Sequence, residues 1–259
     1  MIDTLERIEA NLNYAGKGAG LSRKLVSIHD GRAILDRLTL DQQGFVLRRH
    51  ETAVSNFFDP AEVRSIYYPE VERLLMETTG AEKAVAFEHD VRCASTTERD
   101  STGTRQAVKV VHDDYTEKSA PARVRLYLPQ EADALLRRRY AVINVWRPIK
   151  GPVLDTPLAI CDAQTIAQAD LLPTEEGVKH EVYLFNFNPN HRWYYFSAMT
   201  TSEVLLLKCF DSARDRRARL TAHSAFDLPA MQPHSQARQS IEVRALVFFS
   251  HDATTIASA

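Results

Sequence analysis

The segment Ala141-Val-Ile-Asn-Val-Trp146 opens a long part of the chain in which short extended segments follow one another. β-Branched and aromatic residues, which favour strands, fill these segments, and turn residues bound them. No amphipathic stretch between them reaches a typical helix length. The expected strands are Ala141–Trp146, Pro157–Cys161, Glu181–Phe187, Trp193–Ser197, Glu203–Phe210 and Ile241–Phe249.

The first half of the chain adds strands and two helices to this pattern. Helices are predicted over Pro69–Thr79, which ends at Gly80, and over Gln130–Arg139. At least eight short strands in one domain indicate a β-rich sandwich, barrel or jelly roll, the last class including the cupin-like double-stranded β-helix. Composition alone does not choose among the three. The additional strands are expected at Lys24–Ile28, Phe45–Arg49, Ala84–Phe87 and Ala107–Val111.

The bulk composition restricts the kind of protein. The 259 residues, 44% of them apolar, suit a single domain over residues 1–259, with a core at about 84–249 and a peripheral segment at 1–20. A formal net charge of −2 excludes the basic surplus of a nucleic-acid binder and favours a small-molecule partner. Three widely spaced cysteines and no signal-like or membrane-spanning apolar run predict a cytoplasmic protein. Homo-oligomerisation stays open.

A possible metal site follows the expected strand Ala107–Val111. Side chains at positions i and i+2 of an extended segment point to the same side, so His112 and Asp114 can bind one ion while Asp113 points away. A facial triad of two histidines and one carboxylate holds Fe(II) and leaves positions open for O₂ and an organic co-substrate. Such a site needs a distant histidine, and His223 is the best candidate. On its own the His-x-Asp pattern also fits a strand end with a solvated aspartate.

The other histidines compete less well for the metal. Two of them lie within aromatic or apolar surroundings: His89 near Phe87, and His191, which alternation places on the same side as Trp193 and Tyr195. These side chains either contact a substrate or make structural contacts in the core. The remaining five are expected at the surface, namely His29, His50, His180, His234 and His251.

Several ordered blocks resemble one family, the hydroxylase/desaturase group that includes fungal AsaB, gibberellin desaturases and the cephalosporin-tailoring protein CmcJ. The resemblance extends from about Phe45 to Phe249. It departs from the family pattern at Ser224, where threonine is usual, and at Cys93, where a second arginine is usual. The main blocks are Asn144-Val-Trp-Arg-Pro148, Pro157-Leu-Ala-Ile-Cys-Asp162, His191-Arg-Trp-Tyr-Tyr-Phe196, Leu205-Leu-Leu-Lys-Cys-Phe-Asp-Ser212, His223-Ser-Ala-Phe226 and Ser240-Ile-Glu-Val-Arg244.

This resemblance implies an Fe(II)/2-oxoglutarate-dependent oxygenase on a double-stranded β-helix, using O₂ to hydroxylate or desaturate a specialised metabolite or an amino-acid-like compound. The family's metal ligands fall on His112, Asp114 and His223, which would therefore be the catalytic residues. Substrate contact is expected from His89, Arg92, His191, Trp193 and Tyr195.

The distal carboxylate of 2-oxoglutarate needs a cation, and a guanidinium binds a carboxylate through two hydrogen bonds. Arg244 lies in the otherwise apolar strand Ile241–Phe249, where a charge requires an anionic partner. That partner is either the co-substrate or a structural acid such as Glu242. Lys208 and Arg147 are the alternative cations.

Two other functions remain compatible with the same residues. One is a non-catalytic, cupin-like protein whose histidines only hydrogen-bond a small ligand. The other is a hydrolase or isomerase with zinc or manganese at the same ligands.

Overall fold

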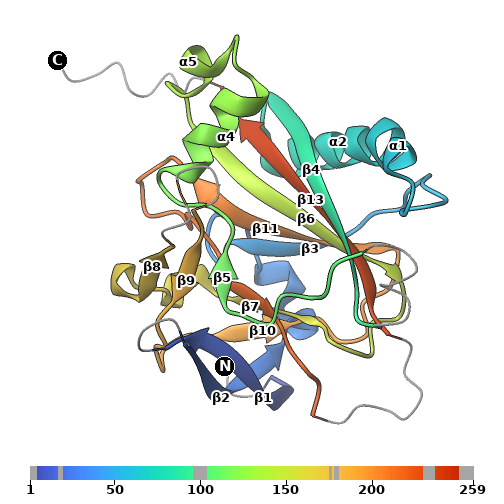
Figure 1. Ribbon diagram of the computed structural model, residues 1–259, viewed down its shortest axis with the longest axis vertical. Helices are drawn as coiled ribbons and strands as arrows, with labels where there is room; N and C mark the ends of the chain where they lie inside the picture. Colours follow the sequence, from blue (N-terminus) through green and yellow to red (C-terminus); the bar gives the residue numbers. More distant parts are fainter. Residues whose placement is uncertain are drawn as a thin grey trace.

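The computed structural model describes residues 5–16, 20–95, 104–174, 177, 181–229 and 237–250. Two β-sheets dominate this part of the chain, and the helices lie outside them (Figure 1). Among the described residues, no helix is both long and apolar enough to cross a membrane. The five histidines expected at the surface include three, His180, His234 and His251, that lie outside the described residues.

The five-stranded sheet is antiparallel and forms the main wall of the interior. Two of its long strands, β6 and β13, pair over their whole length and contain many β-branched and other apolar residues. Residues opposite one another in this register share a face, so Asn144 and Arg244 point to the same side. The order is β3 (Phe45–Arg49), β11 (Glu203–Asp211), β6 (Tyr140–Lys150), β13 (Gln239–Phe248) and β4 (Lys83–Cys93).

The eight-stranded sheet has shorter strands and bends back on itself. Its first strand approaches the middle of the sheet, where the Val111 amide donates to the Asn13 carbonyl over 2.8 Å. Strands β2 and β10 are parallel, and the other neighbouring pairs are antiparallel. The order is β1 (Arg7–Ala15), β2 (Leu21–Asp30), β10 (Trp193–Tyr195), β7 (Leu158–Cys161), β12 (His223–Ala225), β5 (His112–Asp113), β9 (Tyr183–Phe185) and β8 (Leu171–Pro173).

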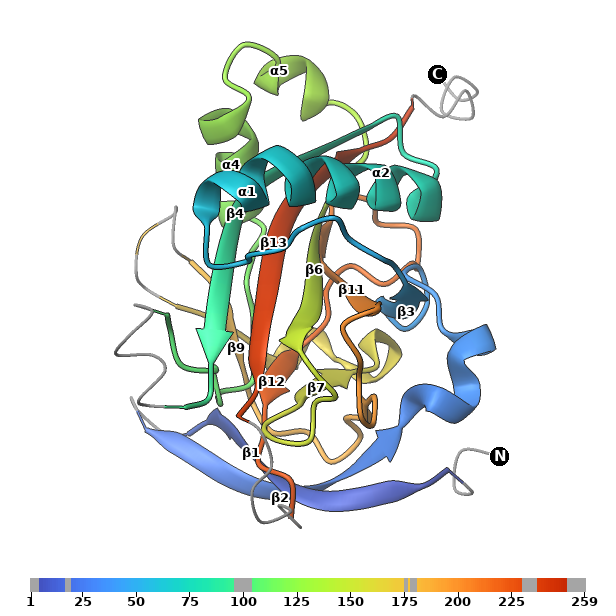
Figure 2. The same cartoon turned by 90° about the vertical axis from the view of Figure 1, so that its right-hand side faces the viewer.

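Helices cover the outer face of the five-stranded sheet. Figure 2 shows α1 and α2 lying across β4, β13 and β6. Gly80 ends α2 with φ of 69°, a left-handed conformation that glycine adopts without steric cost. The helices are α1 (Pro60–Glu62), η2 (Val63–Tyr67), α2 (Tyr68–Thr79), α4 (Ser119–Tyr127) and α5 (Ala132–Leu135), with short turns η1 (Gly31–Arg37), η3 (Ala163–Thr165) and η4 (Gln168–Asp170).

Two apolar clusters stabilise this arrangement. The larger contains fully buried side chains from both sheets and from α2, such as Leu75, Ile160 and Leu246. The smaller lies where the eight-stranded sheet bends back, and it includes Tyr14 of β1 and Trp193 of β10. Burial of large aromatic side chains makes each cluster a major source of stability.

The structure confirms the predicted double-stranded β-helix and most of its strands. The prediction of a strand over Ala107–Val111 was wrong, because the described strand here is only His112–Asp113. Residues 107–111 make isolated bonds instead, such as that from the Ala225 amide to the Val108 carbonyl.

The predicted helix Gln130–Arg139 was also largely wrong, since only Ala132–Leu135 is helical. The chain enters β6 at Tyr140, and Arg139 pairs with Asp211 of β11. A longer helix, Ser119–Tyr127, precedes it; its proline, Pro121, lies in the first turn, where proline is tolerated.

Candidate metal centre and its cavity

Two paired strands bring the predicted metal ligands together. His223 of β12 lies directly opposite His112 of β5, with ring centroids 4.4 Å apart. Asp114 follows β5, and its Oδ1 lies 3.6 Å from His112 Nε2. One ligand atom from each residue lies within 4.8 Å of the others. The structure therefore gathers His112, Asp114 and His223 in one small volume.

Hydrogen bonds orient both imidazole rings in the same way. His112 Nδ1 lies 2.7 Å from the Val110 carbonyl, and His223 Nδ1 lies 3.1 Å from the Thr221 carbonyl. A carbonyl only accepts, so each Nδ1 carries the proton and each Nε2 keeps its lone pair. Metal-binding histidines commonly have this arrangement.

The charge states of the three residues also suit a divalent cation. Burial lowers the pKa of His112 to about 4 and lowers the pKa of His223, so both rings are neutral near pH 7. Burial opposes ionisation of Asp114, but the charge of Arg244 and the hydrogen bond from Asn144 help to hold its pKa below the usual range. Two neutral imidazoles and one carboxylate are the donor set of a non-haem iron site.

A second group of side chains, Asp113, Cys209 and His223, is equally compact but suits a metal poorly. Burial raises the pKa of Asp113 and of Cys209 well above their usual values. Both groups are therefore protonated at neutral pH, whereas a metal binds the carboxylate and the thiolate.

A cavity of about 540 Å³ opens beside Asp114 and Arg244. Its walls include Tyr115, the helix α4 residue Arg123 and several charged side chains of β4. Arg92, one of the predicted substrate contacts, lines it as well. Because the candidate ligand Asp114 lines this cavity, an organic molecule bound there lies at the edge of the candidate metal centre.

Arg244 is already bonded to carboxylates of the protein through all three guanidinium nitrogens. Its Nη1 lies 2.9 Å from Asp90 Oδ2, its Nη2 3.1 Å from Glu242 Oε1, and its Nε 3.3 Å from Asp114 Oδ2. The structure thus shows the alternative pairing with Glu242 that the sequence left open, and it extends that pairing to a candidate metal ligand.

Sequence reasoning missed two buried polar residues, Arg238 and Ser240. Arg238 is 3% exposed and donates from Nη1 to the Thr156 carbonyl over 2.6 Å. Within the described residues, neither Arg238 Nε nor Ser240 Oγ has a hydrogen-bond partner, although both atoms are buried. Because buried polar groups are normally hydrogen-bonded, we expect a ligand or a water molecule to bond these two atoms. The sequence signal was the Arg-x-Ser order at the start of the last strand.

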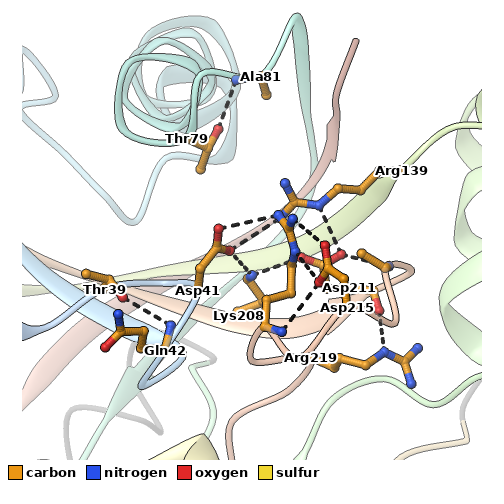
Figure 3. A network of polar contacts seen from close by, with 12 residues as sticks. Thr39, Asp41, Gln42, Thr79, Ala81, Arg139, Lys208, Asp211, Asp215 and Arg219 are labelled. Carbon is orange, nitrogen blue, oxygen red and sulfur yellow. Dashed lines mark hydrogen bonds and ion pairs between the residues drawn. The ribbon is translucent and has the colours of Figure 1, made fainter. Parts of the chain in front are cut away.

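Lys208 and Arg147 lie on the other face of the five-stranded sheet. Lys208 is opposite Ile143, one residue out of phase with the inward-facing Asn144. Figure 3 shows Lys208 between Asp41 and Asp211, where its Nζ lies 2.6 and 2.9 Å from their oxygens. Arg147 likewise shares the outer face and bonds the His50 carbonyl. The structure does not bring these two cations to the metal ligands.

His89 points away from the centre of the cavity. Although it lies at the cavity's edge, its Nδ1 is 2.9 Å from the hydroxyl of Tyr68 in α2. His89 therefore makes the structural hydrogen bond that the sequence left open as an alternative to substrate contact.

The stripe of His191, Trp193 and Tyr195 belongs to the smaller apolar cluster. Trp193 Nε1 donates to the Tyr14 hydroxyl over 2.9 Å, and His191 Nδ1 lies 3.1 Å from the same hydroxyl. Tyr195 packs edge-on against Phe226. Tyr194 and His223 both lie opposite Ile160, so these three side chains share one face of the sheet, the face of the larger cluster. Trp193 and Tyr195 alternate with Tyr194 and therefore lie on the other face. The structure does not bring the stripe to the metal ligands.

Comparisons with known proteins agree with this architecture. Residues 7–248 match a family described as Oxidoreductase/YMDC permease-like domain. The chain is 34% identical to the hydroxylase/desaturase efuI of Hormonema carpetanum, over 86% of this chain and 83% of that protein. It is 33% identical to the Fe(II)/2-oxoglutarate-dependent dioxygenase nvfI of Aspergillus novofumigatus, over 86% and 82%.

A solved structure supports the same relationship. The iron and α-ketoglutarate-dependent endoperoxidase NvfI superposes with a TM-score of 0.86 at 28% identity, over 94% of this chain and 98% of that chain. The fold and the histidine–carboxylate cluster place the protein in the class of double-stranded β-helix oxygenases. The chain belongs to the hydroxylase/desaturase family of Fe(II)/2-oxoglutarate-dependent oxygenases. The family predicted from the sequence is confirmed.

Proposed function

We propose that the protein is an Fe(II)/2-oxoglutarate-dependent oxygenase that hydroxylates or desaturates a small specialised metabolite, with His112, Asp114 and His223 as its iron ligands. The observation that carries the assignment is the convergence of three ligand atoms within 4.8 Å at the edge of a cavity. When bound, iron and 2-oxoglutarate supply the oxidising power through O₂. The family's relatives favour this chemistry over a zinc or manganese hydrolase.

The protein's own residues position the reactants. Asn144 and Arg244 both bond Asp114 Oδ2, which fixes the carboxylate and leaves Oδ1 toward His112. The cavity walls place a target C–H bond next to the metal ligands, and placement decides which bond reacts. Tyr115 is buried beside Asp114 and supplies an apolar surface.

We assign the distal carboxylate of 2-oxoglutarate to Arg238 and Ser240 rather than to Arg244. The support is the unpartnered Arg238 Nε and Ser240 Oγ within the described chain, on strand β13 and the residues just before it. Burial lowers the pKa of Arg238 to about 10, yet the side chain stays charged at neutral pH and benefits from an anion. Arg244 has three acidic partners already.

Slow turnover of 2-oxoglutarate without a primary substrate tests this function. Protein loaded anaerobically with Fe(II) is exposed to O₂ and 2-oxoglutarate, and succinate is measured. We expect succinate from the iron-loaded protein, none from zinc- or manganese-loaded protein, and none from the His223→Ala variant. Stoichiometric iron without any succinate would instead favour the non-catalytic binding protein, and succinate formation that survives His223→Ala would refute the ligand assignment.

A further inference from the structure

The cavity beside the metal ligands is strongly charged, and the inference drawn from it rests on the proposed function. Four arginines and three carboxylates line it, together with His89 and the less polar side chains of Val182 and Tyr115. A purely apolar molecule would displace water from these charged groups and offer them no hydrogen bond in return, which is costly. The cavity therefore favours a substrate with at least one charged group.

The arginines of the cavity differ in how far carboxylates of the protein compensate them. The four arginines are balanced in formal charge by Glu88, Asp90, Asp114 and Glu242, and the charges of Fe(II) and of the 2-oxoglutarate dianion also cancel. Arg244 is compensated by Glu242, which lies 3.1 Å from it. Asp90 is shared by Arg92, Arg105 and Arg244 at 3.3, 3.3 and 2.9 Å. Glu88 is the remaining acid of the cavity wall.

Arg123 of α4 is a largely buried arginine of the cavity wall that makes few bonds to the protein. It makes one 3.3 Å contact, from Nη1 to Glu88 Oε1. That same oxygen accepts a 2.5 Å hydrogen bond from the Tyr127 hydroxyl, so Glu88 is already bound by another donor. The side chain of Arg123 is 13% exposed. Its Nε is buried and has no hydrogen-bond partner in the described part of the chain. A guanidinium that makes only one long contact, and that has a nitrogen without a partner, can bind a carboxylate through two of its nitrogens.

We propose that the primary substrate carries a carboxylate and that Arg123 holds it, which fixes the orientation of the substrate relative to the metal. Arg123 lines the same cavity as Asp114, so a molecule held at this guanidinium extends toward the metal ligands. The apolar surface of Tyr115 then contacts the body of the substrate. Arg123 is thus a specificity-determining residue, and the substrate class is organic acids rather than neutral hydrocarbons.

Matched acids and amides test the proposal. Benzoate, 3-phenylpropanoate and 5-phenylpentanoate, each beside its primary amide, are titrated by calorimetry into anaerobic protein loaded with Fe(II) and 2-oxoglutarate. We expect at least one acid to bind about ten- to hundredfold more tightly than its amide, as a charge-assisted hydrogen bond predicts. Arg123→Gln should abolish this preference. Arg125→Gln should keep it, because Arg125 is an exposed arginine on the same helix.

Three results would overturn the proposal: no acid preferred over its amide, an unchanged preference in Arg123→Gln, or a weakened affinity of that variant for 2-oxoglutarate, which would assign Arg123 to the co-substrate. Arg123→Lys, which retains the charge, should keep part of the preference and guards against a variant that fails to fold. The charge-transfer band of the Fe(II)–2-oxoglutarate protein is recorded throughout. Its absence from the wild-type protein would refute the proposed function itself, whereas its presence with no acid preference refutes only the role of Arg123.

Discussion

Asn144 Nδ2 donates to Asp114 Oδ2 over 2.7 Å, which ties the candidate carboxylate ligand to the middle of the five-stranded sheet. Asn144 is fully buried in β6, so its position is fixed by two neighbouring strands. Partners of this kind orient metal ligands and tune metal affinity. The bond links the two sheets at the site where the iron is expected.

The first prediction concerns this bond. Asn144→Ala should weaken Fe(II) affinity about ten- to hundredfold, because Asp114 loses an orienting donor. Asn186→Ala, which removes an exposed amide, should leave the affinity unchanged. Anaerobic titration of Fe(II) with a competing chelator measures both. An Asn144→Ala variant that is folded and binds iron normally would show that Asp114 does not depend on this bond, or is no ligand.

A second prediction separates the two candidate anchors of 2-oxoglutarate. Arg238→Lys should weaken co-substrate binding about ten- to hundredfold, because lysine cannot reproduce the two parallel bonds of a guanidinium. Arg244→Lys should instead lower stability and iron affinity, since its partners are Asp90, Glu242 and Asp114. The 2-oxoglutarate concentration at half-maximal charge-transfer absorbance distinguishes the variants. The reverse pattern, in folded protein with normal iron content, would restore the assignment to Arg244.

Lys208 is expected to act on stability alone. Lys208→Met removes the partner of buried Asp211, which keeps its 2.7 Å contact with Arg139 (Figure 3). The free energy of unfolding should therefore fall by about 1–3 kcal/mol, the cost of leaving buried charge less well paired. Urea unfolding measures this change. Iron and 2-oxoglutarate binding should be those of the wild type, and a weakened co-substrate affinity with unchanged stability would contradict the structural role.

Trp193 provides a similar test for the aromatic stripe. Trp193→Phe leaves the buried Tyr14 hydroxyl without its indole donor and creates a small cavity, at a cost of about 1–3 kcal/mol. Succinate formation in the absence of a primary substrate should not change. Thermal unfolding and succinate release, measured on the same variant, show whether the stripe stabilises the fold or belongs to the active site. A stable variant that had lost turnover would place the stripe at the active site.

The structure brings together the three metal ligands that the sequence proposed, in part because their geometry is local. The i, i+2 spacing of His112 and Asp114 fixes two ligands from one segment, and the family pattern supplied His223. The same reasoning placed β3 at its observed bounds, Phe45–Arg49. By contrast, β1 lay in the segment expected to be peripheral, because its pairing with β2 depends on a partner strand rather than on its own composition.

The sequence did not determine which face of the sheet each of the other candidate side chains would occupy. Lys208 was plausible as an inward cation until the register placed it opposite Ile143 on the outer face. His191, Trp193 and Tyr195 do share one side, as alternation required, but the sequence does not say which apolar cluster that side meets. Arg238 was missed because its unpartnered Nε is a property of the tertiary structure.

The central claim, that His112, Asp114 and His223 hold the iron to which 2-oxoglutarate binds, is tested most directly by one anaerobic titration. Fe(II) is added to the protein in the presence of 2-oxoglutarate, and the metal-to-ligand charge-transfer absorbance is followed in the wild type and in His112→Ala, Asp114→Ala and His223→Ala. We predict a band that saturates at one iron per wild-type chain and is lost in each of the three folded variants. A band of wild-type intensity and midpoint in the Asp114→Ala or His223→Ala variant would contradict the account.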